Sequence, residues 1–145
     1  MTKQKGFTII ELIVVIAIIA ILATVILFSI TKYINKSKNA SIQGALSGLI
    51  PTGEVWYDNN NGFGYKDFCE SSAIENVNSS TIFPSATPCE QDGKPAVCCS
   101  VDQSDFSSWA ACAREFSSEK FFCVDSIGHK EEITSGCDNN ITTCL

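Results

Sequence analysis

The chain has 145 residues, enough for one small globular domain and one membrane-length segment. Its ten basic and sixteen acidic residues give a net charge of −6, but the charges are unevenly distributed. Residues 1–38 carry five lysines and one glutamate, whereas residues 39–145 carry five basic and fifteen acidic residues. The C-terminal part therefore has no excess of positive charge with which to bind a phosphate backbone, and nucleic acid is not an expected partner.

A stretch of twenty residues without a charged side chain, residues 12–31, follows a short basic N-terminus. As a helix this stretch is about 30 Å long, which matches the hydrocarbon core of a bilayer. A secretory signal peptide would have a shorter apolar run and a small-residue cleavage site followed by a polar break. An ordinary signal anchor would account for the span but for none of the residues that precede it.

The residues that precede the span read MTKQKGFTIIE, and Glu11 is the one charge at the start of the apolar run. A glutamate in a membrane helix costs a few kcal/mol, so it indicates a function beyond anchoring. The stretch KGFTIIELIVVIAIIAILA resembles the leader and helix start of type IV pilins and of the pseudopilins of type II secretion. The resemblance covers about residues 3–27. It implies that residues 1–6 are a leader, that prepilin peptidase cuts between Gly6 and Phe7, and that the new Phe7 amine is N-methylated.

Glu11 gains a physical role if the chain is cut after Gly6. The cut creates a charged amine at Phe7, and within a bundle of such helices that amine and the Glu11 carboxylate of a neighbouring copy would neutralise each other. Either charge left alone in an apolar core is costly, so the pair favours one axial register of the helices. Many type IV pilins have a proline later in this run. Here no proline or glycine lies between Phe7 and Gln43, and a straighter helix is expected.

Beyond the span, residues 32–57 are predicted to continue as an amphipathic helix. Apolar residues recur there at a spacing of three to four, namely Tyr33, Ile34, Ile42, Ala45, Leu46 and Leu49. This stripe is expected to contact the core of the domain, opposite a polar face that includes Asn39 and Gln43. Pro51 and Gly53 are expected to end or kink the helix, with one more turn at residues 55–57.

Residues 58–95 are predicted to be a loop-rich connection, because they are rich in Asn, Ser, Gly and Pro. The sheet is predicted within residues 96–145. Residues 108–114 and 120–125 read as an antiparallel hairpin whose turn is centred on Ser117-Ser118. Residues 95–101 and 130–134 are further strand candidates. The expected fold class is therefore α+β, with a long N-terminal helix whose first half, residues 7–31, spans the membrane and whose second half packs on a small antiparallel sheet.

All eight cysteines lie at or after residue 69, and there is no C-x-x-C pair that would favour zinc. Such dense cysteine in a small domain predicts a disulfide framework formed in an oxidising compartment. The hairpin places Cys112 opposite Cys123, and these two are predicted to be bonded. The adjacent Cys98 and Cys99 should have separate partners, because successive strand residues point to opposite faces. The remaining pairing stays open among Cys69, Cys89, Cys98, Cys99, Cys137 and Cys144; the tail that carries the last two is expected to be bonded.

The lysines give a conflicting signal on membrane orientation. Lys32, Lys36 and Lys38 follow the span, against Lys3 and Lys5 before it, so their number does not favour a cytoplasmic N-terminus. Disulfides and the leader both favour an external C-terminal domain, and the three lysines are assigned to the outer interface.

No catalytic motif is found in the sequence, and no enzyme activity, cofactor or metal is expected. His129 is interpreted as a solvated turn residue, and Asp102, Asp105, Asp125 and Asp138 as solvated acids rather than calcium ligands. The leading hypothesis is a structural subunit of a surface filament, held in the inner membrane with its N-terminus in the cytoplasm before assembly. Its expected partners are other copies of itself, minor pilins, prepilin peptidase, the pilus assembly platform and the membrane. The alternatives are a pseudopilin of a periplasmic type II secretion pseudopilus and a membrane-anchored, disulfide-rich binding module.

Overall fold

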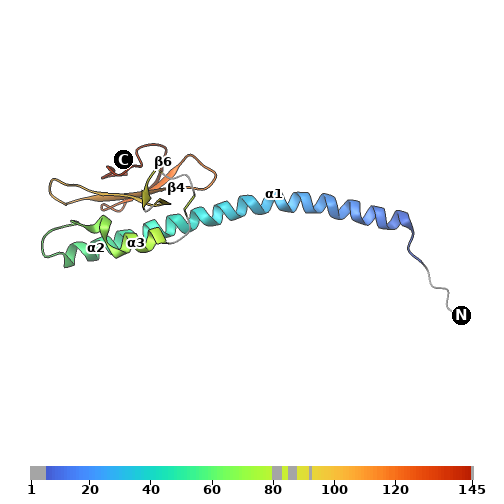
Figure 1. Cartoon of the computed structure of the whole chain (residues 1–145), viewed down its shortest axis with the longest axis horizontal. Coiled ribbons are helices and arrows are strands. Elements are labelled where there is room, and N and C mark those ends of the chain that lie inside the picture. Colours follow the sequence, from blue (N-terminus) through green and yellow to red (C-terminus); the bar gives the residue numbers. More distant parts are fainter. Residues whose placement is uncertain (1–5, 80–82, 85–87, 92, 145) are drawn as a thin grey trace. The chain divides into compact units, whose positions relative to one another are not determined.

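The computed structural model describes residues 6–79, 83–84, 88–91 and 93–144, with the backbone alone for residue 28. The chain divides into two compact units, Met1–Asn35 and Lys36–Leu145. Helix α1 (Ile9–Ser47) makes up most of the first unit and is also the first element of the second (Figure 1). Residues 1–5 of the expected leader lie outside the described residues.

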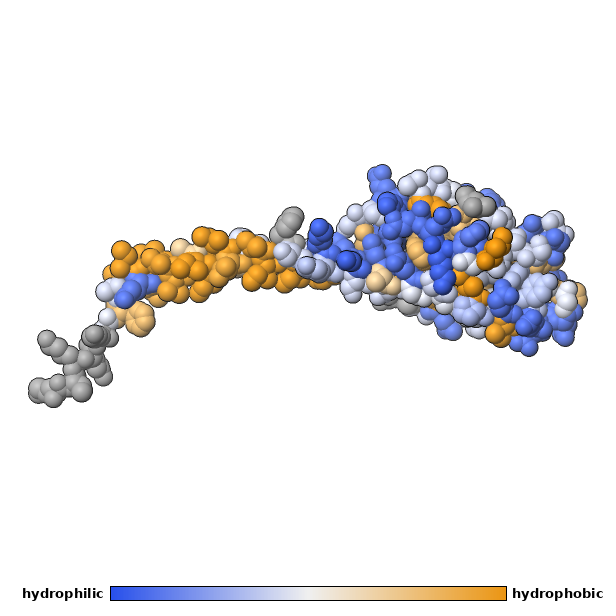
Figure 2. Space-filling model, turned by 180° about the vertical axis from the view of Figure 1, so that it is seen from behind, coloured by the Kyte–Doolittle hydropathy of each residue, from blue (hydrophilic) through white to orange (hydrophobic). Residues whose placement is uncertain are grey.

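In the first unit, α1 exposes a continuous apolar surface. Every described side chain from Gly6 to Leu27 is exposed, and Figure 2 shows this part of the helix as an almost unbroken apolar surface. The helix is long and apolar enough to cross a membrane, judged by length and composition. It runs without interruption to Ser47, as the lack of proline and glycine before Gln43 allows. This apolar part of α1 therefore requires a further apolar environment, either lipid or another helix.

The break between α1 and α2 (Leu49–Asn59) lies at Gly48, three residues before Pro51. A proline ring clashes with the carbonyl of the residue four positions earlier, which for Pro51 is Ser47, the last residue of α1. Within α2, Pro51 is in the first turn, where its missing N–H would have no helical partner. The predicted interruption is thus confirmed for Pro51. The prediction for Gly53 is wrong, because Gly53 lies within α2 and is buried.

The main sheet has four antiparallel strands in the order β3 (Cys98–Val101), β4 (Trp109–Arg114), β5 (Phe121–Asp125) and β6 (Lys130–Ile133). A separate pair is formed by β1 (Glu90–Gln91) and β2 (Lys94–Pro95). Cys112 lies opposite Cys123 in the β4–β5 register, which confirms the predicted hairpin. The strand expected over residues 95–101 is divided, since β2 ends at Pro95 and β3 begins at Cys98. The strand expected over residues 130–134 is β6.

The connection over residues 58–95 contains more helix than predicted. It includes the short 3₁₀ helix η1 (Phe68–Glu70) and the α-helix α3 (Ser72–Ser79). Within α3, Ile74 is buried, and Ala73 and Val77 pack against the same core. These three positions share one helix face, but polar residues around them obscure the pattern in the sequence. Packing on the core therefore stabilises a helix that local composition does not indicate.

Two layers of buried side chains lie on the two faces of the four-stranded sheet. The face toward the helices contributes Val101, Trp109, Ala111, Ala113, Phe122 and Val124 to a core that also includes Ile42, Leu46, Leu49 and Phe68. The opposite face, called here the outer face, is covered by a smaller cluster of Cys89, Cys98, Ala110, Cys112, Cys123, Cys137, Ile141 and Cys144. Because β4 is central, its residues Trp109 to Ala113 are buried on both sides, which explains their continuous apolar sequence.

The end of α1 is joined to the β4–β5 turn by polar contacts as well as by its apolar stripe. The Asn39 side chain pairs with the backbone of Phe116, accepting from its N–H at 2.7 Å and donating to its carbonyl at 3.4 Å. The Gln43 amide donates to Glu115 at 2.7 Å. Asn39 and Gln43, which were expected on the polar face of the helix, thus use that face to contact the β4–β5 turn. In the stripe itself, Ile42, Leu46 and Leu49 are buried as expected, whereas Tyr33 and Ile34 are exposed.

Candidate functional site

The first candidate site is the start of α1, where Thr8 and Glu11 form a reciprocal cap. The Glu11 carboxylate accepts hydrogen bonds from the Thr8 backbone N–H at 2.8 Å and from the Thr8 hydroxyl at 2.7 Å. The Glu11 backbone N–H in turn donates to the Thr8 hydroxyl oxygen at 3.3 Å. This is the capping-box arrangement, which satisfies N–H groups that have no partner at a helix start. The spacing T-x-x-E was visible in the sequence, but the prediction for Glu11 considered only its charge.

The cap places the two predicted processing residues outside the helix. Gly6 and Phe7 precede the first helical residue, Ile9, and the Phe7 side chain is 89% exposed. The Gly6–Phe7 peptide bond therefore lies outside the helix, between two exposed residues. Glu11 is held in the first turn, where its negative charge also complements the helix dipole. This geometry is compatible with cleavage and with an exposed carboxylate, and it does not by itself test either role.

The disulfide pattern in the second unit differs from the prediction for the hairpin. Cys112 is bonded to Cys137, and Cys123 to Cys144, with Cα–Cα distances of 5.8 and 5.7 Å. The predicted Cys112–Cys123 bond is therefore wrong, although the two residues do lie opposite each other. The C-terminal tail crosses the outer face of the sheet and supplies one cysteine to β4 and one to β5. Strand register brings Cys112 and Cys123 close together, but it does not decide whether they bond to each other. A third segment that reaches the same face can supply other cysteine partners, as the tail does here.

The other two bonds join β3 to the connecting region. Cys98 is bonded to Cys89, and Cys99 to Cys69. The two adjacent cysteines thus have separate partners, as predicted from the alternation of side chains along a strand. The prediction that the tail is held by disulfides is also confirmed, through both of its cysteines.

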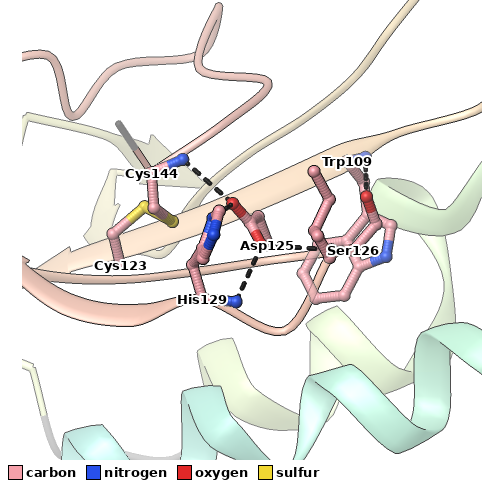
Figure 3. Close-up of polar contacts among 7 residues, drawn as sticks. Trp109, Cys123, Asp125, Ser126, His129 and Cys144 are labelled. Atoms are coloured by element: carbon pink, nitrogen blue, oxygen red, sulfur yellow. Dashed lines mark hydrogen bonds and ion pairs between the residues drawn. A yellow bond between two sulfur atoms is a disulfide. The ribbon is translucent and has the colours of Figure 1, made fainter.

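Asp125, at the end of β5, is a buried carboxylate that the sequence analysis missed (Figure 3). Its side chain is 1% exposed. One oxygen accepts from the backbone N–H groups of Ile127 at 3.1 Å and His129 at 3.0 Å. The other accepts from the Cys144 N–H at 3.2 Å and lies 2.8 Å from Nδ1 of the half-exposed His129 ring. Asp125 therefore joins the β5–β6 turn to the C-terminal tail, beside the Cys123–Cys144 disulfide.

The environment of Asp125 favours its ionised form. Burial alone would raise the pKa of the Asp125 carboxyl, but hydrogen bonds from the Cys144 N–H and from the ring and N–H of His129 outweigh it. The net pKa is therefore lowered from the ordinary value. The interpretation of Asp125 as a solvated acid is wrong, whereas His129 is a turn residue as predicted, with a partly exposed ring that contacts Asp125. Four hydrogen-bond contacts already occupy the carboxylate, so it offers little to a calcium ion.

Metal-binding geometry occurs once among the described residues, in a group of three buried cysteines, Cys98, Cys112 and Cys137. All three are engaged in disulfides, which removes the thiolates that a metal would bind. Asp102 and Asp105 accept hydrogen bonds from Ser104 and Ser107 in their own turn, and Asp138 accepts from the N–H of Asn140.

Comparison with known proteins concerns the N-terminal segment. A family model described as the prokaryotic N-terminal methylation motif matches residues 1–27. The chain is 51% identical over 47 residues to two proteins of Moraxella bovis, the type IV major alpha-pilin and fimbrial protein Q. The aligned part covers 32% of this chain and only 30% of the length of either relative. No solved structure matches the chain.

These matches support the type IV pilin family and a methylation-type leader. The structure agrees at the level of fold, with a long N-terminal helix, small antiparallel sheets and four disulfides. The leader and the apolar helix fit membrane anchoring and a place in a surface pilus.

Proposed function

We propose that this chain is a structural subunit of a type IV pilus-like surface filament, cut after Gly6 and polymerised through α1. The observation that carries the proposal is the apolar surface of α1, which is exposed from Ile9 to Leu27 and carries one carboxylate, Glu11. Outside the membrane such a surface must be covered, because keeping it from water by packing on copies of itself is worth about 25 cal/mol per Å² of apolar area. The similarity to two named pilins supports this use of the helix.

Glu11 gives the proposed assembly its register. In the uncut chain the carboxylate is satisfied by Thr8, three residues away. Cleavage after Gly6 leaves a free amine only one residue before Thr8. In a bundle of helices, this amine on one copy and Glu11 on the next can form an ion pair, whereas either charge alone in the apolar core costs several kcal/mol. A shift of one helix along another separates the pair, so its formation selects one stagger.

Before assembly, the proposal places the chain in the inner membrane as a single-pass protein with a cytoplasmic N-terminus. The partners at that stage are the membrane, prepilin peptidase and the pilus assembly platform, and later other copies of this chain and minor pilins. The second unit then forms the outside of the filament, where four disulfides suit an oxidising environment. No catalytic role is part of the proposal.

The first test is the mass of the mature N-terminus in purified filaments. The expected terminus is Phe7 carrying one methyl group, and any other terminus contradicts processing at Gly6.

The second test separates the two roles of Glu11. Replacing Glu11→Ala should leave insertion and cleavage intact but abolish filaments seen by electron microscopy. The matched control is Thr8→Ala, which removes the two hydrogen bonds of the Thr8 hydroxyl and keeps the carboxylate, and it should still assemble. Filaments formed normally by the Glu11→Ala chain would contradict the charge pair. Equal loss in both variants would show that the cap, rather than the pair, is what assembly requires.

A further inference from the structure

Three cysteines lie in a row across the outer face of the sheet. Cys98 of β3 is the register partner of Cys112 of β4, which is the register partner of Cys123 of β5. All three are fully buried. Each is bonded to a segment outside the four strands, at Cys89, Cys137 and Cys144, respectively. The outer face therefore carries three disulfides on neighbouring strands.

Two of these disulfides are close enough to react with each other. The sulfur atoms of Cys98, Cys112 and Cys137 all lie within 4.8 Å of one another. A thiolate freed at Cys98 would thus be near both sulfurs of the Cys112–Cys137 bond before any backbone movement. A bond from Cys98 to Cys112 also fits the backbone, because opposite residues in an antiparallel pair have Cα atoms about 4.5–5.5 Å apart, within the range of disulfides.

Cys99 provides an internal contrast to Cys98. It is the next residue on β3 and points to the opposite face, where it is bonded to Cys69 and packs against the helix-side core. Cys99 is not part of the group of close sulfurs. A thiolate freed at Cys99 is therefore separated by the sheet from the three disulfides of the outer face.

We propose that the row is a thiol–disulfide relay, through which reduction of the Cys89–Cys98 bond is passed to the C-terminal tail. A dithiol reductant attacks Sγ of Cys89 and releases Cys98 as a thiolate. The second thiol of the reductant then displaces Cys89, so that the dithiol is oxidised to its disulfide and the protein gains two electrons. The Cys98 thiolate attacks Sγ of Cys112, forming the Cys98–Cys112 bond. Cys137 leaves with the electron pair and takes a proton from solvent.

The second step conserves the number of disulfides but changes which segments they join. Before the exchange, Cys137 and Cys144 both attach the tail to the sheet. After it, Cys123–Cys144 is the one disulfide that attaches the tail, beside the hydrogen bond from the Cys144 N–H to Asp125 and the packing of Ile141 on the outer face. The chemistry suits a dithiol oxidoreductase of an oxidising compartment as the partner. The inference depends on the sheet and its cysteines and is independent of filament assembly.

The relay is tested with a pair of single variants that free adjacent cysteines. Cys89→Ala frees Cys98, and the matched control Cys69→Ala frees Cys99. The full-length oxidised proteins, in detergent, are alkylated at pH 8 and mapped without reduction, with cleavage at Asp102 and Arg114 to separate the labelled positions. The relay predicts that Cys89→Ala loses label at Cys98 and gains it at Cys137. Label gained at Cys112 instead would overturn the relay, because a Cys98–Cys137 bond would still hold the tail. The control should be labelled at Cys99.

A second measurement uses the unaltered chain, so that a folding defect in a variant cannot decide the result. The oxidised protein is treated with a limiting amount of dithiothreitol, quenched with acid and mapped after alkylation at low pH with a maleimide. Molecules that have lost one disulfide, and in which Cys89 is labelled, should carry the second label at Cys137. A second label at Cys98, together with label retained at Cys98 in Cys89→Ala, would overturn the proposal.

Discussion

The two compact units of the chain, Met1–Asn35 and Lys36–Leu145, differ in where their apolar side chains lie. In the first, large apolar residues from Phe7, at 89% exposed, to Ile30, at 47%, remain on the surface. In the second, Phe68 and Trp109 have no exposed surface. Burial of apolar area is the main favourable contribution to folding, so the second unit contains its own stabilisation. The first must obtain it from lipid or from other copies.

The units also differ in the range of their polar contacts. At the start of α1 the cap joins Thr8 to Glu11, three residues apart. In the second unit Asn39 contacts Phe116, 77 residues away, and the disulfides join positions separated by 9 to 30 residues. The polar contacts described here are thus local in sequence in the first unit and long-range in the second. A substitution should therefore affect one unit without the other, and four changes test that separation.

The largest expected effect comes from removing the disulfide that holds the end of the tail. In the double variant Cys123→Ala with Cys144→Ala, the second unit should lose about 3 kcal/mol of unfolding free energy, since the bond closes a loop of 21 residues. Both tryptophans of the chain, Trp56 and Trp109, lie in this unit, so fluorescence during denaturant unfolding in detergent reports it selectively. Helicity of the first unit should not change. An unaltered unfolding midpoint would show that the tail contributes little to the stability of the sheet.

Asp125→Asn should produce a pH-dependent loss. The replacement removes charge-assisted hydrogen bonds to the turn and tail, at a cost of about 2 kcal/mol at neutral pH. Because the pKa of Asp125 is lowered in the folded chain, its contribution is complete above the ordinary value of 3.8 and is lost as the pH falls below it. The difference in unfolding free energy between the two proteins should therefore be constant near neutrality and shrink in acid. A difference that stays constant down to pH 2 would contradict the assignment.

Gly53→Ala tests the close contact between α2 and the sheet. A Cβ at Gly53 would lie 2.8 Å from Nε1 of the fully buried Trp109 indole and 3.0 Å from two of its carbons, so the helix must move, at a cost of about 1–3 kcal/mol. The control is Gly44→Ala in α1, where nothing lies within 4 Å and alanine should stabilise the helix by about 0.5–1 kcal/mol. Thermal unfolding followed by tryptophan fluorescence should shift in opposite directions. A shift of the same sign in both would exclude the indole contact as the cause.

The smallest effect is expected for Thr8→Ala, which removes the two hydroxyl contacts of the capping box. The loss should be about 1 kcal/mol or less and be confined to the first turn of α1. Amide hydrogen exchange in micelles should become faster at residues 9–12, while tryptophan-detected unfolding remains unchanged. A change in the stability of the second unit would show that the two units are more closely coupled than their contacts indicate.

Much of the fold followed from the sequence where the determinants are close together. The uninterrupted helix depends on the absence of proline and glycine, and the hairpin depends on two apolar runs around a short polar turn; both were predicted, the hairpin with its register. The start of α1 was predicted as a site because one carboxylate in an apolar run is unusual. Helix α3 was not predicted, because its apolar face becomes evident only against the core it covers.

The sequence by itself determined the exposed apolar helix with Glu11 at its start, because these properties depend on side chains within a few helical turns. It also determined that Cys98 and Cys99 have different disulfide partners, because successive side chains of a strand point to opposite faces. Only the tertiary structure decided which cysteines are bonded and that Asp125 is a buried anchor. Asp125 and two of the four bonds depend on the tail, which returns over the outer face and brings Cys137 and Cys144 to partners 25 and 21 residues away that local spacing does not specify.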